Sequence, residues 1–278
     1  MRKDGVRVKN ADPMYTIMPY ILKHRYDAQN MIELDIPVEP MQAYLNQKRK
    51  EGYYFSHLGV VLAAYVRAAA EFPFVNRFIV NKRIYQRNEF PVGMVVLKPG
   101  ETDGTMNKMF FQMKDDIFQV HETINGYITA NRQQGETNST DSLMKTMLSI
   151  PGLCNAAVGI FKVLDRLGLL PKSIIDASPF HVSMSITNLA SIRTRHIYHH
   201  VYEFGTTSIF ISMGNMRDVP KRVKEEVVFE RCIPMGVVMD ERICSGSYFA
   251  AFFAKFKQYM LNPQLLEGPP KVVNTVLK

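Results

Sequence analysis

The stretch Met239-Asp-Glu-Arg-Ile-Cys-Ser-Gly-Ser247 joins an apolar segment to an apolar helix, and the prediction of the fold starts from it. Residues 235–239 are mostly apolar and indicate a buried strand. Ser245 and its two successors favour a helix start, because short side-chain oxygens satisfy the free N–H groups of a first turn. Phenylalanines then recur at near-helical spacing, which predicts a helix with one buried face that ends before Pro263.

This stretch resembles the C-terminal signature of the chloramphenicol acetyltransferase and dihydrolipoyl acyltransferase superfamily. In that superfamily the pattern Asp-His-Arg-x-x-Asp-Gly-x precedes an apolar helix that ends in Asn-Pro. The positions that match the pattern are Asp240, Arg242, Gly246 and Asn262-Pro263. The catalytic histidine of the superfamily falls on Glu241, and its aspartate falls on Ser245.

A second motif carries the same resemblance at an independent position. The apolar segment 57–71 is followed by Glu-Phe-Pro-x-x-Asn, which ends at Asn76. The resemblance implies an α/β fold like that of chloramphenicol acetyltransferase, a two-layer sandwich in which helices cover a mixed β-sheet. We expect an N-terminal arm over 1–14, an acyltransferase-like domain over 15–266 and a C-terminal tail over 267–278.

The remaining elements follow from local patterns. Alternation of apolar and polar residues predicts strands, while Pro40, Ser56 and Asp115 or Asp116 are suited to begin helices. The strands expected are 31–38, 77–85, 92–97, 105–113, 180–188, 207–213 and 225–239. The helices expected are 41–50, 57–71, one that ends near Arg132, and two that are separated near Pro151-Gly152. A polar loop is expected over 133–138, and residues 1–14 are expected to be loose.

Composition places the chain among ordinary globular proteins. It has 278 residues, of which 46% are hydrophobic and 22% are charged. Lys and Arg number 34 against 26 Asp and Glu, which gives a formal net charge of +8. This charge suits a phosphorylated ligand such as coenzyme A. The basic residues form no dense block and no recognised motif, so we expect no nucleic-acid partner.

Cysteine usage and hydropathy bear on the compartment. The three cysteines are widely spaced and form no Cys-x-x-Cys pair, and the first residues contain no apolar signal core. We therefore expect a cytoplasmic protein. The most apolar stretch, 143–170, is interrupted by charged residues and Pro151, which predicts core or interface helices rather than a membrane span.

The sequence Ser185-Ile-Thr-Asn-Leu-Ala190 resembles a second motif of the superfamily, Ser-Asn-x-Gly at the end of a strand. In that motif a hydroxyl donates a hydrogen bond to the tetrahedral oxyanion. Thr187 falls on the hydroxyl position, and Asn188 matches its neighbour. A preorganised donor of this kind contributes about 3 kcal/mol to a transition state. The alternative is that Thr187 is a strand hydroxyl bonded to the backbone.

The residue at the histidine position decides between two kinds of protein. In the superfamily the histidine takes a proton from the thiol of coenzyme A or dihydrolipoamide. An ordinary thiol has a pKa near 8.5, an imidazole about 2 units lower and a glutamate about 4 units lower. Replacing histidine by Glu241 therefore costs roughly 3 kcal/mol in driving force. Glu241 is either a structural carboxylate, paired with an arginine for example, or a base in a dry site that raises its pKa. Ser245 keeps hydrogen bonding but loses the charge of the aspartate.

The histidine cluster Arg195-His-Ile-Tyr-His-His200 offers another base. His196 and His200 have the i, i+4 spacing of two zinc ligands on a helix, but only Glu203 could extend the set, so we expect no metal. We instead consider that an imidazole of the cluster, His199 or His200, enters the substrate channel and replaces the missing base. The alternative is a cluster at an interface or in a loop.

Two functions follow from the resemblance, which implies homotrimers with each active site between two subunits. The first is a catalytically degenerate homologue that binds a ligand or scaffolds an assembly, with other acyltransferase-complex subunits as possible partners. The second is an active coenzyme A-dependent acyltransferase that uses Glu241 or a histidine of 196–200 as its base.

Overall fold

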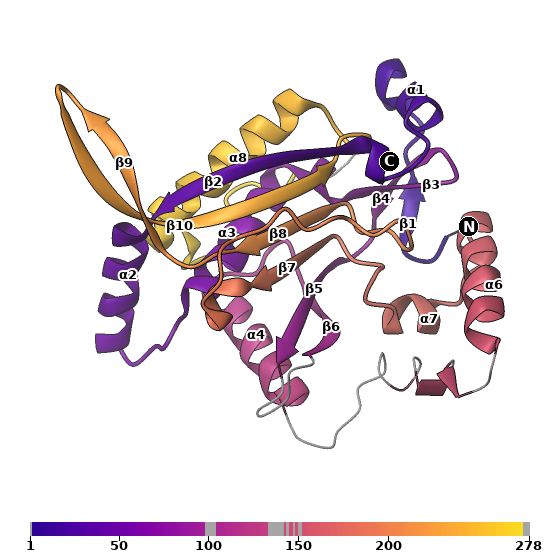
Figure 1. The fold of residues 1–278 in the computed structure, drawn as a ribbon, viewed down its shortest axis with the longest axis horizontal. Helices are drawn as coiled ribbons and strands as arrows, with labels where there is room; N and C mark the ends of the chain where they lie inside the picture. The colour runs from indigo at the N-terminus through magenta and orange to yellow at the C-terminus, as the bar shows by residue number, and fades with distance from the viewer. Residues whose placement is uncertain are drawn as a thin grey trace.

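A computed structural model describes residues 2–97, 104–132 and 152–274, with five isolated residues between 142 and 149. Its main element is a seven-stranded sheet with the order β2-β10-β8-β7-β5-β6, and β9 pairs with β10 (Figure 1). The strands are β2 (Gln29–Pro37), β5 (Phe90–Leu97), β6 (Gly104–Phe111), β7 (Met184–Asn188), β8 (Ile209–Met213), β9 (Arg217–Val223) and β10 (Glu226–Asp240). The β5–β7 and β7–β8 pairs are parallel and the others antiparallel, which confirms the predicted mixed sheet.

Helices cover one face of this sheet and enclose the core with it. They are α2 (Val38–Lys50), α3 (His57–Glu71), α4 (Ile117–Arg132) and α8 (Gly246–Leu261). The Ser56 hydroxyl accepts a hydrogen bond from the Gly59 N–H at 3.1 Å, so α3 begins and ends where the sequence predicted. The ring of Tyr65 on α3 meets Phe252 and Phe256 of α8 at centroid distances of 5.1 and 5.7 Å.

A second, three-stranded sheet has the order β1-β4-β3. It consists of β1 (Gly5–Arg7), β3 (Arg77–Val80) and β4 (Arg83–Arg87). The single strand expected over 77–85 is therefore wrong: Asn81 and Lys82 have φ of 48° and 58°, a turn conformation that divides it. The segment expected to be loose over 1–14 is ordered in its described part, residues 2–14, because Gly5–Arg7 pairs with β4 and Arg2 is buried in an ion pair with Asp165 at 2.8 Å.

The other face of the main sheet carries an extended segment, residues 193–207. The Ile197 N–H donates to the Ser212 hydroxyl at 3.0 Å, and a Cβ on Gly236 or Gly214 would collide with the backbone of this segment. The segment therefore crosses β8 and β10 closely. It is not helical, so the helical spacing inferred for His196 and His200 is wrong.

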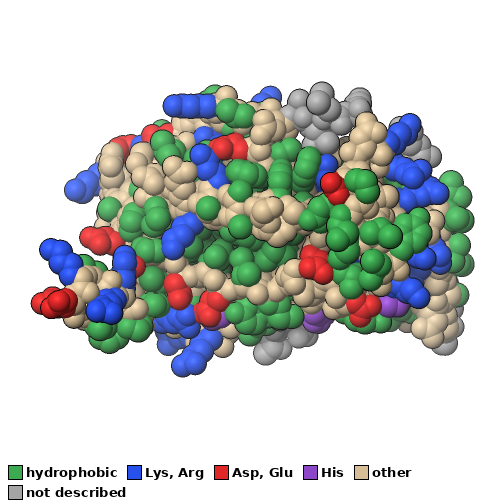
Figure 2. Space-filling view, turned by 90° about the horizontal axis from the view of Figure 1, so that it is seen from above, with side chains coloured by type: hydrophobic (Ala, Val, Ile, Leu, Met, Phe, Trp, Pro, Cys, Tyr) green, Lys and Arg blue, Asp and Glu red, His purple; other side chains and the backbone are tan. Residues whose placement is uncertain are grey.

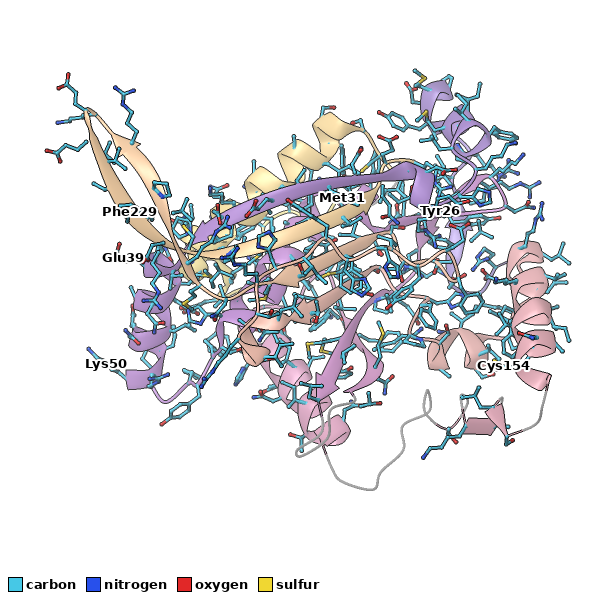
Figure 3. The ribbon with its side chains drawn as sticks, viewed as in Figure 1. Tyr26, Met31, Glu39, Lys50, Cys154 and Phe229 are labelled. Carbon is cyan, nitrogen blue, oxygen red and sulfur yellow. The ribbon has the colours of Figure 1, made fainter. Side chains whose placement is uncertain are left out.

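Several elements were not predicted. The first helix, α1 (Pro13–Ile21), precedes β2, and α7 (Lys172–Ala177) follows α6 (Leu153–Leu167). A hairpin made by β9 and the first half of β10 projects beyond the sheet, and Phe229 on it is 72% exposed (Figure 3). Within the described residues, none of the helices combines the length and hydrophobicity needed to cross a lipid bilayer.

Some predictions lie outside the described residues, namely the loop over 133–138 and most of the helix expected before Pro151. The second of the two helices expected there is α6. The division of the chain at residues 14 and 266 stays a prediction.

Candidate active site

The turn that carries the signature motif, residues 240–247, is called the signature turn below. It begins at Asp240, the last residue of β10. Asp240 is fully buried and forms a two-pronged ion pair with Arg242, with Nε–Oδ1 and Nη2–Oδ2 distances of 2.7 and 2.6 Å. Arg25 approaches the same carboxylate, with Nε 3.5 Å from Oδ2. Burial opposes the charge of Arg242, but the hydrogen bonds and charge of Asp240 outweigh it and raise the pKa of Arg242. The two matched signature residues therefore form a structural ion pair.

Glu241 is the residue predicted to fall on the histidine position of the signature. Its backbone N–H donates to the Ala28 carbonyl at 2.9 Å, and its side-chain Oε2 accepts a hydrogen bond from Asn30 Nδ2 at 2.6 Å. The side chain is half-buried, and its partner is an amide on β2 rather than an arginine. The protomer thus does not supply the dry pocket that a glutamate base would need.

Ser245 occupies the aspartate position and caps α8. Its Oγ accepts a hydrogen bond from the Tyr248 N–H at 3.0 Å, and it lies 2.9 Å from the Ser247 hydroxyl. This is the helix-start role that the sequence predicted. Where the superfamily has a carboxylate, this chain has an uncharged cap.

Thr187 lies near the end of β7, on the face of the sheet opposite the helices. It is half-buried, and its hydroxyl makes no hydrogen bond with any residue that the structure describes, so it is not the backbone-bonded hydroxyl of the alternative. The side-chain oxygen of its neighbour Asn188 is also buried without a partner in the described part of the chain. A free hydroxyl at this position is available to a ligand.

The strand register sets the separation of Thr187 from Glu241. Thr187 pairs with Ser212, and Ser212 pairs with Gly236. Glu241 follows Gly236 by five residues, which corresponds to about 17 Å along the strand direction at roughly 3.3 Å per residue. The two residues therefore cannot act together within one protomer.

The histidines of the cluster have different surroundings. His196 Nε2 lies 3.4 Å from Glu33 Oε1, and His200 is exposed. His199 is half-buried, stacks on Phe210 with ring centroids 4.0 Å apart, and lies with its Nδ1 2.9 Å from the His200 carbonyl oxygen. Burial lowers the pKa of His199, so its imidazole is neutral near neutral pH.

The hydrogen bond of His199 fixes its tautomer. A carbonyl oxygen only accepts, so Nδ1 carries the proton and donates it, and Nε2 keeps a free lone pair. A neutral imidazole with a free Nε2 is chemically a base. Among the described residues no three His, Cys, Asp or Glu side chains are grouped to hold a metal ion, and Glu203 instead accepts a hydrogen bond from the Arg25 N–H at 2.7 Å.

Three residues of this region had no signal in the sequence. Arg25 supports Asp240, Asn30 holds Glu241, and Phe210 carries the ring of His199. Arg25 and Asn30 lie more than 200 residues from their partners along the chain, so no local pattern could have joined them.

The fold and the signature turn can both be compared with known proteins. Residues 181–267, which include Thr187, Glu241 and Ser245, match the family "2-oxoacid dehydrogenases acyltransferase (catalytic domain)". The resemblance inferred from the signature is therefore confirmed, and the fold is that of the chloramphenicol acetyltransferase-like acyltransferases. No curated protein matches the sequence.

Solved structures agree on the fold over nearly the whole chain. A probable dihydrolipoamide acetyltransferase from Listeria monocytogenes 4b F2365 has a TM-score of 0.57 at 13% identity, covering 97% of this chain and 99% of its own. A chloramphenicol acetyltransferase gives 0.57 at 11% identity, with 92% and 99% covered. The cubic core of a pyruvate dehydrogenase multienzyme complex gives 0.56 at 11% identity, with 93% and 94% covered.

Proposed function

We propose that this chain is an oligomeric homologue of the acyltransferase catalytic domain that works by binding and assembly, without acyl transfer at the signature turn. The observation that carries this proposal is the set of contacts at the histidine position. The Glu241 carboxylate is half-buried and is held through one oxygen, Oε2, by the side-chain amide of Asn30. Ser245 serves as a helix cap.

The physical argument is one of proton affinity. Transfer from a thiol to an ordinary carboxylate is uphill by about 5.7 kcal/mol, against about 2.7 kcal/mol to an imidazole. This difference in proton-transfer free energy corresponds to roughly a hundredfold in rate if the whole of it appears in the activation free energy. The Asp240–Arg242 ion pair keeps the turn folded without helping this step. The turn retains the groups needed for structure and lacks the group needed for chemistry.

An oligomer is supported by two features of the protomer. The separation of about 17 Å between Thr187 and Glu241 means that only residues of two copies could share one site. The projecting hairpin exposes Val227 and Phe229 by 64% and 72%, and Met31 on the edge strand β2 is 53% exposed (Figure 3). We propose a homotrimer, as the resemblance implies, with other subunits of an acyltransferase complex as candidate partners. The cytoplasmic location proposed for it rests on the cysteine usage.

The surface suits contact with other proteins over a broad face. Seen from above, hydrophobic side chains spread along the middle of the molecule, and charged side chains lie toward both of its ends (Figure 2). Exposed apolar area of this kind is what an assembly buries. Sedimentation that shows a stable monomer at micromolar concentration would remove the oligomeric part of the proposal.

A second candidate function is an active coenzyme A-dependent acyltransferase, and one observation favours it. His199 is neutral with a free Nε2, and Phe210, which it stacks on, is two residues from the Ser212 that pairs with Thr187. An imidazole base and an oxyanion donor would then lie on the same face of the sheet. In the transfer tested below, the thiol of dihydrolipoamide or the hydroxyl of chloramphenicol would lose the proton and attack the acetyl group, and coenzyme A would be the leaving group. The described residues include no dedicated phosphate-binding loop.

The experiment that separates the two functions is acetyl transfer from acetyl-coenzyme A to dihydrolipoamide or chloramphenicol. The variants are His199→Gln and Glu241→Gln, with the exposed His24→Gln as a matched control. The binding proposal predicts no enzymatic transfer by the wild type or any variant. Transfer that is lost in His199→Gln and kept in His24→Gln would establish the second function instead.

A further inference from the structure

A large cavity lies away from Thr187 and the histidine cluster. Its volume is about 1040 Å³, and it is enclosed by the N-terminal strand, the turn between α3 and β3, and the first turn of α8. Residues that line it include Phe74, Arg77, Gln86 and Tyr248, together with the charged side chains of Lys9 and Glu71. Tyr248 touches the signature turn through its N–H, which donates to Ser245, and the other lining residues lie outside the candidate active site.

Arg77, the first residue of β3, is the unusual member of the lining. It is only 7% exposed, yet its side chain makes no ion pair or hydrogen bond with any residue that the structure describes, and its Nε is buried without a partner. Burial lowers the pKa of Arg77 to about 10, against smaller opposing effects of Cys244 and Tyr248. A guanidinium remains charged at neutral pH even so, and a buried charge without a counter-ion is costly.

The aromatic contacts of Arg77 do not account for its burial. Its guanidinium centre lies 3.3 Å from the centroid of Phe74, and Phe74 stacks on Tyr248 with centroids 4.7 Å apart. A cation–π contact contributes about 0.5 to 2 kcal/mol, which is less than the several kcal/mol lost on burying an ion. A negatively charged group from outside the protomer would supply the missing stabilisation.

Two aromatic rings and an amide among the other lining residues favour a small organic ligand over a metal ion. The Phe74 and Tyr248 rings offer an apolar wall beside the charge. Gln86 donates through Nε2 to the Pro73 carbonyl at 3.1 Å, while its Oε1 is buried without a partner among the described residues. The cavity therefore combines one buried cation without an ion pair, an amide and an aromatic surface. Of its other charged residues, Arg7 and Lys9 are exposed, and Glu71 and Arg87 are ion-paired with Lys255 and Asp4.

We propose that this cavity binds a small organic anion, a carboxylate or phosphate ester with an apolar part, with Arg77 as the counter-charge. A planar guanidinium holds either oxyanion with two parallel hydrogen bonds, and the aromatic wall takes the apolar part. The inference goes beyond the proposed function, because it depends on neither Glu241 nor the oligomer.

The test uses phenyl phosphate and phenylacetate as probes, with neutral benzyl alcohol as the matched uncharged compound and NaCl at equal ionic strength. Thermal unfolding and calorimetry are followed for the wild type, Arg77→Gln and Arg83→Gln. Arg83 is an exposed arginine of the same small sheet and serves as the control. We expect saturable binding of at least one anion, weakened about tenfold to a hundredfold in Arg77→Gln and unchanged in Arg83→Gln.

A second variant covers the case in which Arg77→Gln does not fold. Gln86→Glu keeps Arg77 and places a carboxylate in the same cavity, so it should weaken binding of both anions by repulsion. Stronger binding of phenyl phosphate than of phenylacetate would assign the natural ligand to phosphate esters, and the reverse order would assign it to carboxylates. The proposal is overturned if neither anion binds at millimolar concentration, or if binding is the same in the wild type and in Gln86→Glu.

Discussion

Arg242 and Arg77 are two buried arginines with opposite surroundings. Arg242, in the signature turn, holds Asp240 by two short hydrogen bonds, and its pKa is raised. Arg77, beside the cavity, has no carboxylate among the described residues, and its pKa is lowered. The signature turn is thus electrostatically complete within the protomer, whereas the cavity is not.

The difference between the paired Arg242 and the unpaired Arg77 indicates where a ligand could bind. A buried charge that the protein neutralises itself serves the fold, and removing its partner should unfold the protein. A buried charge that the protein leaves unneutralised calls for a partner from outside the protomer. The resemblance draws attention to the signature turn, but the unsatisfied charge lies in the cavity near Tyr248.

Breaking the Asp240–Arg242 ion pair of the signature turn should have the largest effect on stability. Asp240→Asn leaves Arg242 and Arg25 buried near a neutral group, so we expect a loss of about 3 to 5 kcal/mol in the free energy of unfolding. Urea denaturation measures it, with the exposed Asp218→Asn as control. A loss below about 1 kcal/mol would show that the ion pair does not hold the turn.

Removing the unpaired charge of Arg77 should change the free energy of unfolding in the opposite direction. Arg77→Met replaces an unpaired buried cation by an apolar side chain of similar length, so we expect the free energy of unfolding to rise by about 1 to 2 kcal/mol. The matched variant Arg242→Met should lower it. Urea denaturation of both proteins tests the comparison directly, and a loss in Arg77→Met similar to that in Arg242→Met would contradict it.

Lys108 extends the comparison to a third buried cation. Its Nζ donates to the carbonyls of Ile175 and His181, it forms no ion pair with the described residues, and burial lowers its pKa from 10.5 to about 7. Between pH 7 and 10.5 the unfolded chain binds more protons at Lys108 than the folded chain does, so the free energy of unfolding rises with pH in this window. Below about pH 7, Lys108 is protonated in both states and contributes no pH dependence.

Lys108 contributes at most about 1.4 kcal/mol per pH unit to the slope of the free energy of unfolding against pH. We expect Lys108→Met to remove it, because methionine does not titrate, whereas Lys172→Met at an exposed, ion-paired position should keep it. Urea denaturation at several pH values above 7 measures the slope. Equal slopes for the wild type and Lys108→Met would show that Lys108 does not titrate as its burial implies.

The smallest effect concerns the cap at the signature turn. Ser245→Ala removes the acceptor for the Tyr248 N–H, and we expect a loss of about 1 kcal/mol, similar to that for Ser56→Ala at the start of α3. Ser245→Asp should retain the stability, since aspartate also caps helices. If Ser245→Ala is neutral in thermal or urea unfolding while Ser56→Ala is not, the capping role of Ser245 is wrong.

The sequence predicted the main fold because its decisive signals are local. The apolar run after Ser56 and the phenylalanine spacing after Gly246 lie within single helices, and both helices form as expected. The split at Asn81 and Lys82 was missed because the flanking residues all suit a strand, and the turn depends on backbone φ values.

The site was less predictable because its contacts join distant segments. The spacing of His196 and His200 suggested a helix, but the segment is extended since it packs across β8 and β10. The hydrogen bond from Asn30 to Glu241 spans 211 residues of sequence. That Arg77 has no carboxylate partner is a property of the folded arrangement alone, so no motif could have marked it.

We propose that the signature turn keeps its structure but does not support acyl transfer, and acetyl transfer by the Glu241→His, Ser245→Asp double variant is the sharpest test of this proposal. A histidine restores a base about 2 units below the thiol pKa, and the aspartate restores the supporting charge. With acetyl-coenzyme A and dihydrolipoamide, we expect the wild type to show only the uncatalysed background rate and the double variant a rate about a hundredfold higher. Wild-type transfer that Glu241→Gln leaves unchanged and His199→Gln abolishes would contradict the account.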